Sequence, residues 1–245
     1  MKVIILCAGR GRRFKLKKPK CLLTLGKKTL LEICLNNLKS NNIKPRDIIF
    51  ATGFKEDLIR KKIGNKFTFI KNKSYLTTNM VYTFFNTIKN VSGHDIVIIY
   101  SDIVFNAKDI KNLIKSKNKF TTLVDVNWEK IWAKKGKLLE DSETLKIKNN
   151  QIISLGKKTK NIKNIDGRFV GITKISSELI ENLKLIYKRN LKNNPKKFKK
   201  IDMTNFFNYL IQKKYKFFFT KTHRNWYEFD DKKDLNSYIA QKLKA

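Results

Sequence analysis

Cysteine, proline, acidic residues and long apolar runs are all scarce in this chain of 245 residues, and each shortage excludes something. The three cysteines, Cys7, Cys21 and Cys34, are an odd set without metal-ligand spacing, which argues against a disulfide framework or a zinc site. No apolar run reaches the roughly 18 residues that cross a bilayer. The apolar stretch at the start is shorter than the roughly 7–15 residues of a secretory signal core. We therefore expect reduced thiols, a cytoplasmic location and no membrane insertion.

The shortage of acidic residues leaves the chain strongly basic, with 55 Lys and Arg against 20 Asp and Glu and a formal net charge of +35. Such a surface attracts anions, nucleic acid included. Only 8 of the basic residues are arginine, the residue that reads bases through bidentate contacts. The abundance of Lys, Asn, Ile and Phe is typical of A/T-rich codons instead, so no nucleic-acid partner is expected. The basic run at 195–200 is interpreted as a solvated loop.

What the chain does contain is enough apolar sequence to form a core, since 41% of its residues are hydrophobic and 11% aromatic. Apolar runs alternate with amphipathic stretches in the first half, the order of a mainly parallel sheet with helices on both faces. The expected strands are 3–7, 48–52, 67–70, 96–100, 120–126, a hairpin of 144–148 and 152–155, 169–175 and 216–221. The expected helices are 29–38, 56–63, 79–88, 109–115, 177–187, 203–211 and 232–243. No repeat or linker interrupts the pattern, so one domain over 1–245 is expected.

The most informative segment is the loop after the first expected strand, which reads LCAGRGRRF at 6–14 and continues to KPK at 18–20. Its two glycines allow positive φ and a close approach of the backbone to a ligand. Exposed N–H groups with nearby cations can then cradle a polyphosphate. The third glycine of a dinucleotide fingerprint and the GK[ST] ending of a P-loop are both missing. Gly-x-Gly alone is also typical of a basic surface turn.

Carboxylates follow two other segments. Asp102 comes directly after the apolar run 96–100, at the strand end where open α/β sheets bind ligands, although a helix N-cap is the alternative. The segment WYEFD at 226–230 places Glu228 and Asp230 on one face of an extended chain. Carboxylate oxygens together with several waters suit Mg²⁺. In so basic a chain, a salt-bridged strand end is the other interpretation of that segment.

The loop resembles the L-A-A-G-x-G-x-R…P-K signature of nucleotidyltransferases, with Cys7 in place of the first alanine. The resemblance implies an α/β, three-layer nucleotide-diphospho-sugar-transferase-like (Rossmann-like) fold with a mixed, mainly parallel sheet. It implies a nucleotide-binding half at 1–126 and an acceptor-binding half at 127–245. It also implies direct in-line attack on the α-phosphorus, without a covalent enzyme intermediate. The nucleotide-binding residues implied for the loop are Leu6, Ala8, Gly9 and Gly11, with Arg13 and Lys20 on the phosphates.

The carboxylate segments resemble the metal-binding segments of the same family. SDIVF at 101–105 is similar to G-D-x-x-F, and the segment at 226–230 is similar to W-x-E-I-D. The resemblance therefore implies that Asp102, Glu228 and Asp230 bind Mg²⁺. It implies catalytic roles for Asp102 together with Arg13 and Lys20.

Weaker matches follow in the order found in cytidylyltransferases acting on phosphocholine or aminophosphonates. They are TTNMVYT at 77–83, Asp125, Trp132, EDSE at 140–143, GRFVG at 167–171 and DMT at 202–204. This resemblance implies CMP transfer from CTP to a phosphorylated or phosphonate amino-alcohol-type acceptor (phosphocholine, 2-aminoethylphosphonate or phosphoethanolamine), with release of pyrophosphate. It adds Thr78 and Asn79 to the nucleotide site.

The ammonium of such an acceptor needs a carboxylate or an aromatic face. Asp202 and Trp132 are the candidates for acceptor binding, with an N-cap and plain packing as their respective alternatives. Two other functions stay open. A sugar-1-phosphate nucleotidylyltransferase using dTTP, UTP or GTP would share the loop and the carboxylates, and a non-catalytic basic nucleic-acid-binding protein would need neither. A homodimer is also compatible with the sequence.

Overall fold

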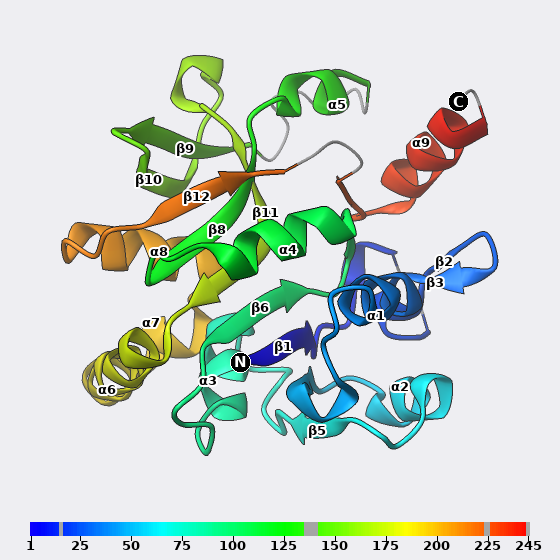
Figure 1. The fold of residues 1–245 in the computed structure, drawn as a ribbon, viewed down its shortest axis with the longest axis horizontal. Helices are drawn as coiled ribbons and strands as arrows, with labels where there is room; N and C mark the ends of the chain where they lie inside the picture. The colour runs from blue at the N-terminus through cyan, green and yellow to red at the C-terminus, as the bar shows by residue number, and fades with distance from the viewer. Residues whose placement is uncertain (15–16, 135–141, 223–225, 244–245) are drawn as a thin grey trace.

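The computed structural model describes residues 1–14, 17–134, 142–222 and 226–243. Within them, the largest feature is a nine-stranded sheet in the order β5-β4-β1-β6-β11-β8-β12-β10-β9 (Figure 1). In chain order, its strands are β1 (Lys2–Cys7), β4 (Ile48–Thr52), β5 (Thr68–Lys71), β6 (Ile96–Tyr100), β8 (Phe120–Asp125), β9 (Glu143–Lys148), β10 (Gln151–Lys158), β11 (Arg168–Ile175) and β12 (Phe218–Lys221).

The sheet is mixed, but most of its strands share one direction. The neighbours β5, β4, β1 and β6 pair in parallel, as do β8 and β12. Only β11 and β10 run against the other strands described here. The expectation of a mixed, mainly parallel sheet is therefore confirmed. Strand β11 lies between β6 and β8, and it joins two strands of the first half through antiparallel ladders on both of its edges.

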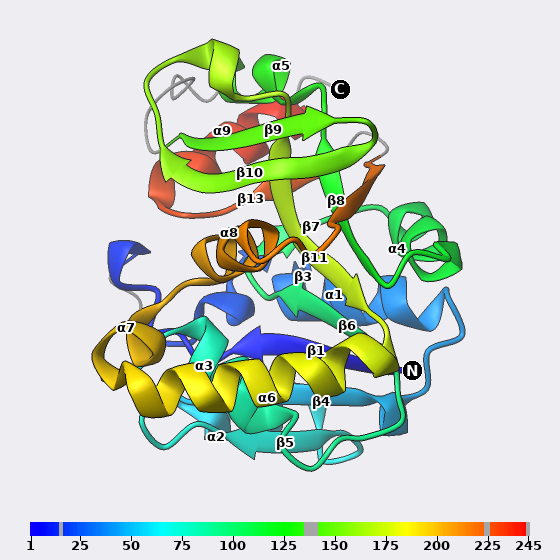
Figure 2. The ribbon, with the colours of Figure 1, turned by 90° about the vertical axis from the view of Figure 1, so that its left-hand side faces the viewer.

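Helices cover both faces of this sheet and complete three layers. One face carries α3, α6, α7 and α8, which Figure 2 shows in front of the strands, and the other carries α1, α2, α4 and α5. The helices are α1 (Leu30–Lys39), α2 (Glu56–Ile63), α3 (Met80–Thr87), α4 (Ala107–Lys115), α5 (Trp128–Lys134), α6 (Ser177–Asn193), α7 (Pro195–Lys200), α8 (Met203–Gln212) and α9 (Lys232–Leu243). None of the described helices has the length and apolar character needed to cross a membrane.

The apolar runs in the sequence form the central strands because successive side chains enter opposite layers. In β1, Ile4 packs into the core under α3 and α6, whereas Val3 and Ile5 pack into the core under α1 and α4. All three side chains are fully buried. A strand covered on both faces loses the alternation of polar and apolar residues, which is why these runs are continuous.

The basic run at 195–200 is helix α7, so its interpretation as a solvated loop is wrong. Asn194 caps the helix by accepting a hydrogen bond from the Lys197 N–H at 3.2 Å, and a proline occupies its first turn. The only aromatic residue of the run, Phe198, is 3% exposed and packs edge-on against Tyr187 and Tyr209. One buried ring is enough to seat the helix, while its lysines stay in solvent.

The observed ends of several other helices and strands differ by a few residues from the expected ones, and capping or turn residues lie at these ends. Helix α4 starts two residues early because Asn106 caps it, accepting from the Lys108 N–H. Helix α6 continues to Asn193, beyond the expected end at 187. The hairpin turn consists of Asn149 and Asn150, both at positive φ, and the strand begins at the next residue. Such a two-residue turn is typical of asparagine.

A small ribbon carries the C-terminal segment across the end of β6. Strand β13 (Tyr227–Glu228) pairs with β7 (Ile103–Val104) in antiparallel fashion. The Phe229 N–H also donates to the Asp102 carbonyl oxygen at 3.0 Å. A third apolar cluster under this ribbon packs Phe229 against Phe14 of the N-terminal loop and Tyr238 of α9. The ribbon therefore brings residues some 125 positions apart to one end of the sheet.

Candidate active site

A cavity of about 990 Å³ opens at the carboxyl ends of β1 and β6. This is the edge where open α/β sheets bind their ligands. Every candidate residue named from the sequence lines it: Leu6, Ala8, Gly9, Gly11, Arg13, Lys20, Thr78, Asn79, Asp102, Trp132, Asp202, Glu228 and Asp230. The fold thus brings together residues from both halves of the chain, and the role of each residue stays a prediction.

The N-terminal loop is shaped by Gly11 and tied to neighbouring strands. Gly11 has a φ of +58°, and a Cβ there would lie 3.2 Å from the Cβ of Lys20, so the backbone passes directly beside that lysine. The Ser101 hydroxyl donates to the Leu6 carbonyl oxygen at 2.7 Å, which fixes the start of the loop against the end of β6. Gly9 has open space around its α-carbon. The loop can therefore approach a phosphate closely through its backbone.

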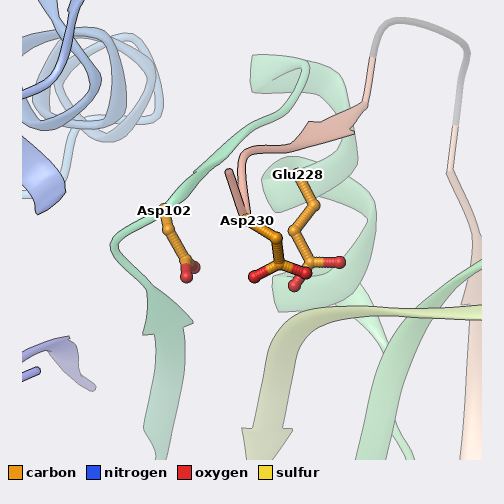
Figure 3. A group of neighbouring side chains, drawn as sticks. All are labelled: Asp102, Glu228 and Asp230. Atoms are coloured by element: carbon orange, nitrogen blue, oxygen red, sulfur yellow. The ribbon is translucent and has the colours of Figure 1, made fainter. Parts of the chain in front are cut away.

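Three carboxylates lie close together in the cavity that this loop lines. Asp102, Glu228 and Asp230 each place an oxygen within 4.8 Å of the others. Figure 3 shows the three carboxylates next to one another, with Asp102 from the segment after β6 and the other two from β13 and the chain beyond it. The side chain of Asp234, 2% exposed, accepts from the N–H groups of Asp230 and Asp231 at 2.7 and 3.1 Å. Oxygen donors from separate, braced segments fit a divalent cation such as Mg²⁺.

Lys20 reaches into the same cluster. Its Nζ lies 2.8 Å from Oδ2 of Asp102 and 3.2 Å from Oδ1 of Asp230, and Nη2 of Arg13 lies 3.2 Å from that second oxygen. Burial alone would lower the pKa of Lys20, but attraction to Asp102 and Asp230 outweighs it and raises the pKa overall. The lysine is therefore protonated at neutral pH, and its charge offsets the mutual repulsion of the carboxylates.

Thr78 and Asn79 line the cavity with side chains already held by the protein. Asn79 caps α3 by accepting from the Met80 N–H at 2.8 Å and donates to the Lys200 carbonyl oxygen at the end of α7. The Thr78 hydroxyl accepts from Asn72 at 2.9 Å and donates to the Ser74 carbonyl oxygen. These hydrogen bonds fix the positions of the Thr78 and Asn79 side chains, so any contact with a nucleotide would be made in addition to them.

Trp132 and Asp202 also line the cavity, in the settings expected for a packing residue and a helix N-cap. The Trp132 ring is 5% exposed and stacks on Trp226, with centroids 5.1 Å apart, and the Arg168 guanidinium carbon lies 4.3 Å from its centroid. Asp202 caps α8 by accepting from the Asn205 N–H at 2.8 Å. The aromatic face of Trp132 therefore meets a protein cation, so a role toward the acceptor would act through Arg168.

Sequence reasoning did not single out Arg168 and Glu143, which also line the cavity. Burial is the largest influence on the pKa of Glu143 and raises it; repulsion from Asp202 adds to this, and a hydrogen bond with Thr204 opposes it. Both residues fell within matched segments but carried no separate signal in a chain rich in charge. Glu140 and Asp141 of the matched segment 140–143 lie outside the described residues.

Comparison with known proteins gives both a family match and a full-length relative. Residues 3–132 match the MobA-like NTP transferase domain. The chain is 32% identical to the CTP:phosphoglutamine cytidylyltransferase of Campylobacter jejuni, over 98% of this chain and 100% of that protein.

Two solved structures share the fold over nearly the whole chain. The inositol-1-phosphate CTP transferase of T. maritima aligns with a TM-score of 0.74 and 16% identity, covering 99% of this chain and 94% of that one. The CTP:phosphocholine cytidylyltransferase of Streptococcus pneumoniae aligns with a TM-score of 0.70 and 17% identity, covering 99% and 98%. At this identity the likeness speaks for the fold alone.

Proposed function

Because this chain belongs to the MobA-like NTP transferase family and is a nucleotidyltransferase, we propose that it transfers CMP from CTP to a small phosphorylated or phosphonate acceptor, releasing pyrophosphate. The observation that carries the proposal is the cavity in which a glycine-rich cationic loop faces three carboxylates. The Campylobacter jejuni relative is named for a reaction of CTP, which supports the choice of nucleotide.

The acceptor proposed for this cavity carries an ammonium group. Glu143 and Asp202 lie close to each other in the lining of the cavity, and two carboxylates there favour a cationic substrate group over a neutral sugar. Phosphocholine, 2-aminoethylphosphonate and phosphoethanolamine meet this requirement. The phosphoglutamine named for the Campylobacter jejuni relative also carries an amine. A sugar-1-phosphate acceptor would bring no positive charge to these carboxylates.

Asp102, Glu228 and Asp230 would hold Mg²⁺, which supplies charge stabilisation at the phosphoryl oxygens when bound. The residues of the chain do the rest by positioning. The backbone around Gly9 and Gly11 binds the triphosphate, and Arg13 and Lys20 stabilise the charge that develops on the leaving pyrophosphate. The attacking acceptor oxygen is already deprotonated near neutral pH, so no general base is required. The α-phosphorus is attacked in line, without a covalent intermediate.

We place nucleotide binding chiefly in 1–126 and acceptor binding in 127–245, within one domain. The loop and Asp102 belong to the first half, and Glu143, Arg168 and Asp202 belong to the second. Glu228 and Asp230 return from the second half to the nucleotide end.

Pyrophosphate release tests the proposal. Each of ATP, CTP, GTP, UTP and dTTP would be supplied with Mg²⁺, together with phosphocholine, 2-aminoethylphosphonate, phosphoethanolamine, phosphoglutamine or glucose 1-phosphate. We expect turnover only with CTP and an amine-bearing acceptor, and none after chelation of the metal. Turnover with glucose 1-phosphate and another nucleotide would replace the proposal with the sugar-nucleotide alternative. Salt-sensitive binding to any DNA duplex without turnover would favour the nucleic-acid-binding alternative.

A further inference from the structure

Arg168 is a cation at the acceptor end whose hydrogen-bonding capacity the described residues do not use up. Its Nη2 donates to the Ser142 hydroxyl at 2.7 Å. Its Nε is shut off from solvent and has no hydrogen-bond partner among the residues the structure describes. No hydrogen bond within that part of the chain engages Nη1, and the side chain lines the cavity. A guanidinium offers five N–H donors, so most of these remain available.

The guanidinium is held in one orientation by indole rings. Its central carbon lies 4.3 Å from the ring centroid of Trp132 and 5.0 Å from that of Trp128. Trp226 stacks on Trp132 at an interplanar angle of 17° and so backs the arrangement. A planar cation fixed in this way presents the fork that binds a carboxylate through two parallel hydrogen bonds. The entropic cost of ordering the arginine has already been met in the free protein.

Arg168 keeps its charge without an ion pair. Burial lowers its pKa to about 10, against the attraction of Glu228, Glu143 and Asp125, so the side chain is protonated at neutral pH. None of the ion pairs within the described part of the chain includes it. A half-buried cation without an ion pair is costly to a protein, and an anionic ligand group would remove that cost.

Carboxylates adjoin the guanidinium without pairing with it. Ser142, which accepts from Arg168, is followed directly by Glu143. Glu143 is in turn close enough to Asp202 for their charges to repel. The guanidinium has Glu143 near it, and Asp202 lies near Glu143. This arrangement matches a ligand that carries a carboxylate and an ammonium a few atoms apart.

We infer that Arg168 binds a carboxylate of the acceptor and that Glu143 and Asp202 bind its ammonium, so that the acceptor is a phosphorylated amino acid or a derivative of one. The inference rests on the proposed function, because it places an acceptor in this cavity. It also separates the duties of the cations. Arg13 and Lys20 lie at the carboxylate cluster and serve the nucleotide, whereas Arg168 serves the part of the acceptor that does not react.

Acceptor pairs that differ only in one carboxylate test the inference. O-phosphoserine would be compared with phosphoethanolamine, and phosphoglutamine with its decarboxylated counterpart, by pyrophosphate release with CTP and Mg²⁺. We expect the carboxylate-bearing member of at least one pair to be preferred by about 10- to 100-fold in kcat/KM, as for a charge-assisted bidentate contact. In Arg168→Gln this ratio should fall close to one. Lys157→Gln removes the same charge from an exposed position on β10 that does not line the cavity, and it should keep the ratio.

Several results would overturn the inference. The inference would be overturned if the wild-type protein showed no preference for the carboxylate-bearing member of either acceptor pair. An equal loss on both members of a pair in Arg168→Gln would assign the arginine to the acceptor phosphate instead. Thermal unfolding would check that Arg168→Gln is folded. If it is not, Arg168→Lys replaces it as the test. That variant keeps the charge but loses the fork, so it should reduce the ratio several-fold.

Failure of the proposed function can be told apart from failure of the inference. If no acceptor is turned over with CTP, the proposed reaction fails. Calorimetric binding of the same pairs then decides the inference, since a preference for the carboxylate-bearing member that Arg168→Gln abolishes would support it. Equal binding, or no measurable binding of either pair, would refute it.

Discussion

Removal of the Lys20 side chain should tighten the binding of Mg²⁺ to the free protein while weakening its use of CTP. The lysine ammonium lies among the carboxylates proposed to hold the metal, 2.8 Å from Asp102 and 3.2 Å from Asp230. In the free protein it is the internal cation of that cluster, and it repels an incoming metal. With CTP bound, the same ammonium is proposed to stabilise the β- and γ-phosphates. Lys20→Ala should therefore move metal affinity and CTP use in opposite directions, whereas most variants of the site would lower both.

The size of the effect follows from the geometry. A Mg²⁺ ion lies about 2.1 Å from a ligating oxygen. With Nζ at 2.8 Å from the Asp102 oxygen, the two cations are within about 5 Å of each other. Their repulsion is about 1.7 kcal/mol at the dielectric constant of water and about 7 kcal/mol at an effective value of 20. Because the Lys20 and Asp102 side chains are only 13% and 24% exposed, the low figure is a minimum. About 2 kcal/mol corresponds to roughly 30-fold tighter metal binding.

Titration calorimetry with Mg²⁺ in the absence of nucleotide measures this affinity directly. Lys27→Ala is the matched control, because it removes the same charge from the exposed turn between β2 (Thr24–Leu25) and β3 (Lys28–Thr29), outside the cavity. Steady-state pyrophosphate release gives the second readout, and the KM for CTP should rise about 10- to 100-fold for the loss of a charge-assisted phosphate contact. If Lys20→Ala bound Mg²⁺ no more tightly than Lys27→Ala, the reasoning about this cluster would be refuted.

Four further variants probe the site and its support. Asp102→Ala should slow turnover by about 100-fold or more, and near-normal pyrophosphate release from folded protein would end its assignment as a metal ligand. Asp234→Ala removes the acceptor for two backbone N–H groups next to Asp230, so the Mg²⁺ concentration for half-maximal activity should rise about 10-fold; an unchanged requirement would contradict the bracing role. Phe198→Ala should cost about 3–5 kcal/mol in urea unfolding, and a loss below 1 kcal/mol would count against a buried anchor for α7. Gly171→Ala places a Cβ 2.7 Å from the Tyr100 ring at a φ of +83°, so its melting temperature should fall by a margin corresponding to about 2 kcal/mol or more, and an unchanged value would show that the strand relaxes.

The elements that follow from local pattern could be predicted from the sequence. Buried parallel strands produce continuous apolar runs, so the positions of β1, β4 and β6 are legible in the chain. The polar residues that follow such runs converge, because parallel strands end at one edge of the sheet. Asp102 and the loop from Leu6 were therefore placed at one site without knowledge of the strand order.

The features that depend on partners distant in sequence could not be predicted. Lys20 meets Asp102 and Asp230 across 82 and 210 positions, and no local spacing encodes that contact. The packing of α7 depends on the contact between Phe198 and Tyr187, and the lysine-rich sequence around Phe198 does not indicate that contact. The isolation of Arg168 depends on where indole rings lie, and composition only marks it as one more basic residue.

The position of β11 has a consequence for how the chain must be synthesised and folded. Residues 168–175 lie between β6 and β8, although both of those strands are complete by residue 125. A ribosome-bound chain that has emerged only to residue 126 therefore holds two central strands with open, apolar edges and nothing to join them. Such edges are templates for aggregation until the missing strand arrives. The proposed nucleotide-binding half is therefore not expected to fold on its own, and a fragment ending at residue 126 should aggregate more readily than the full chain.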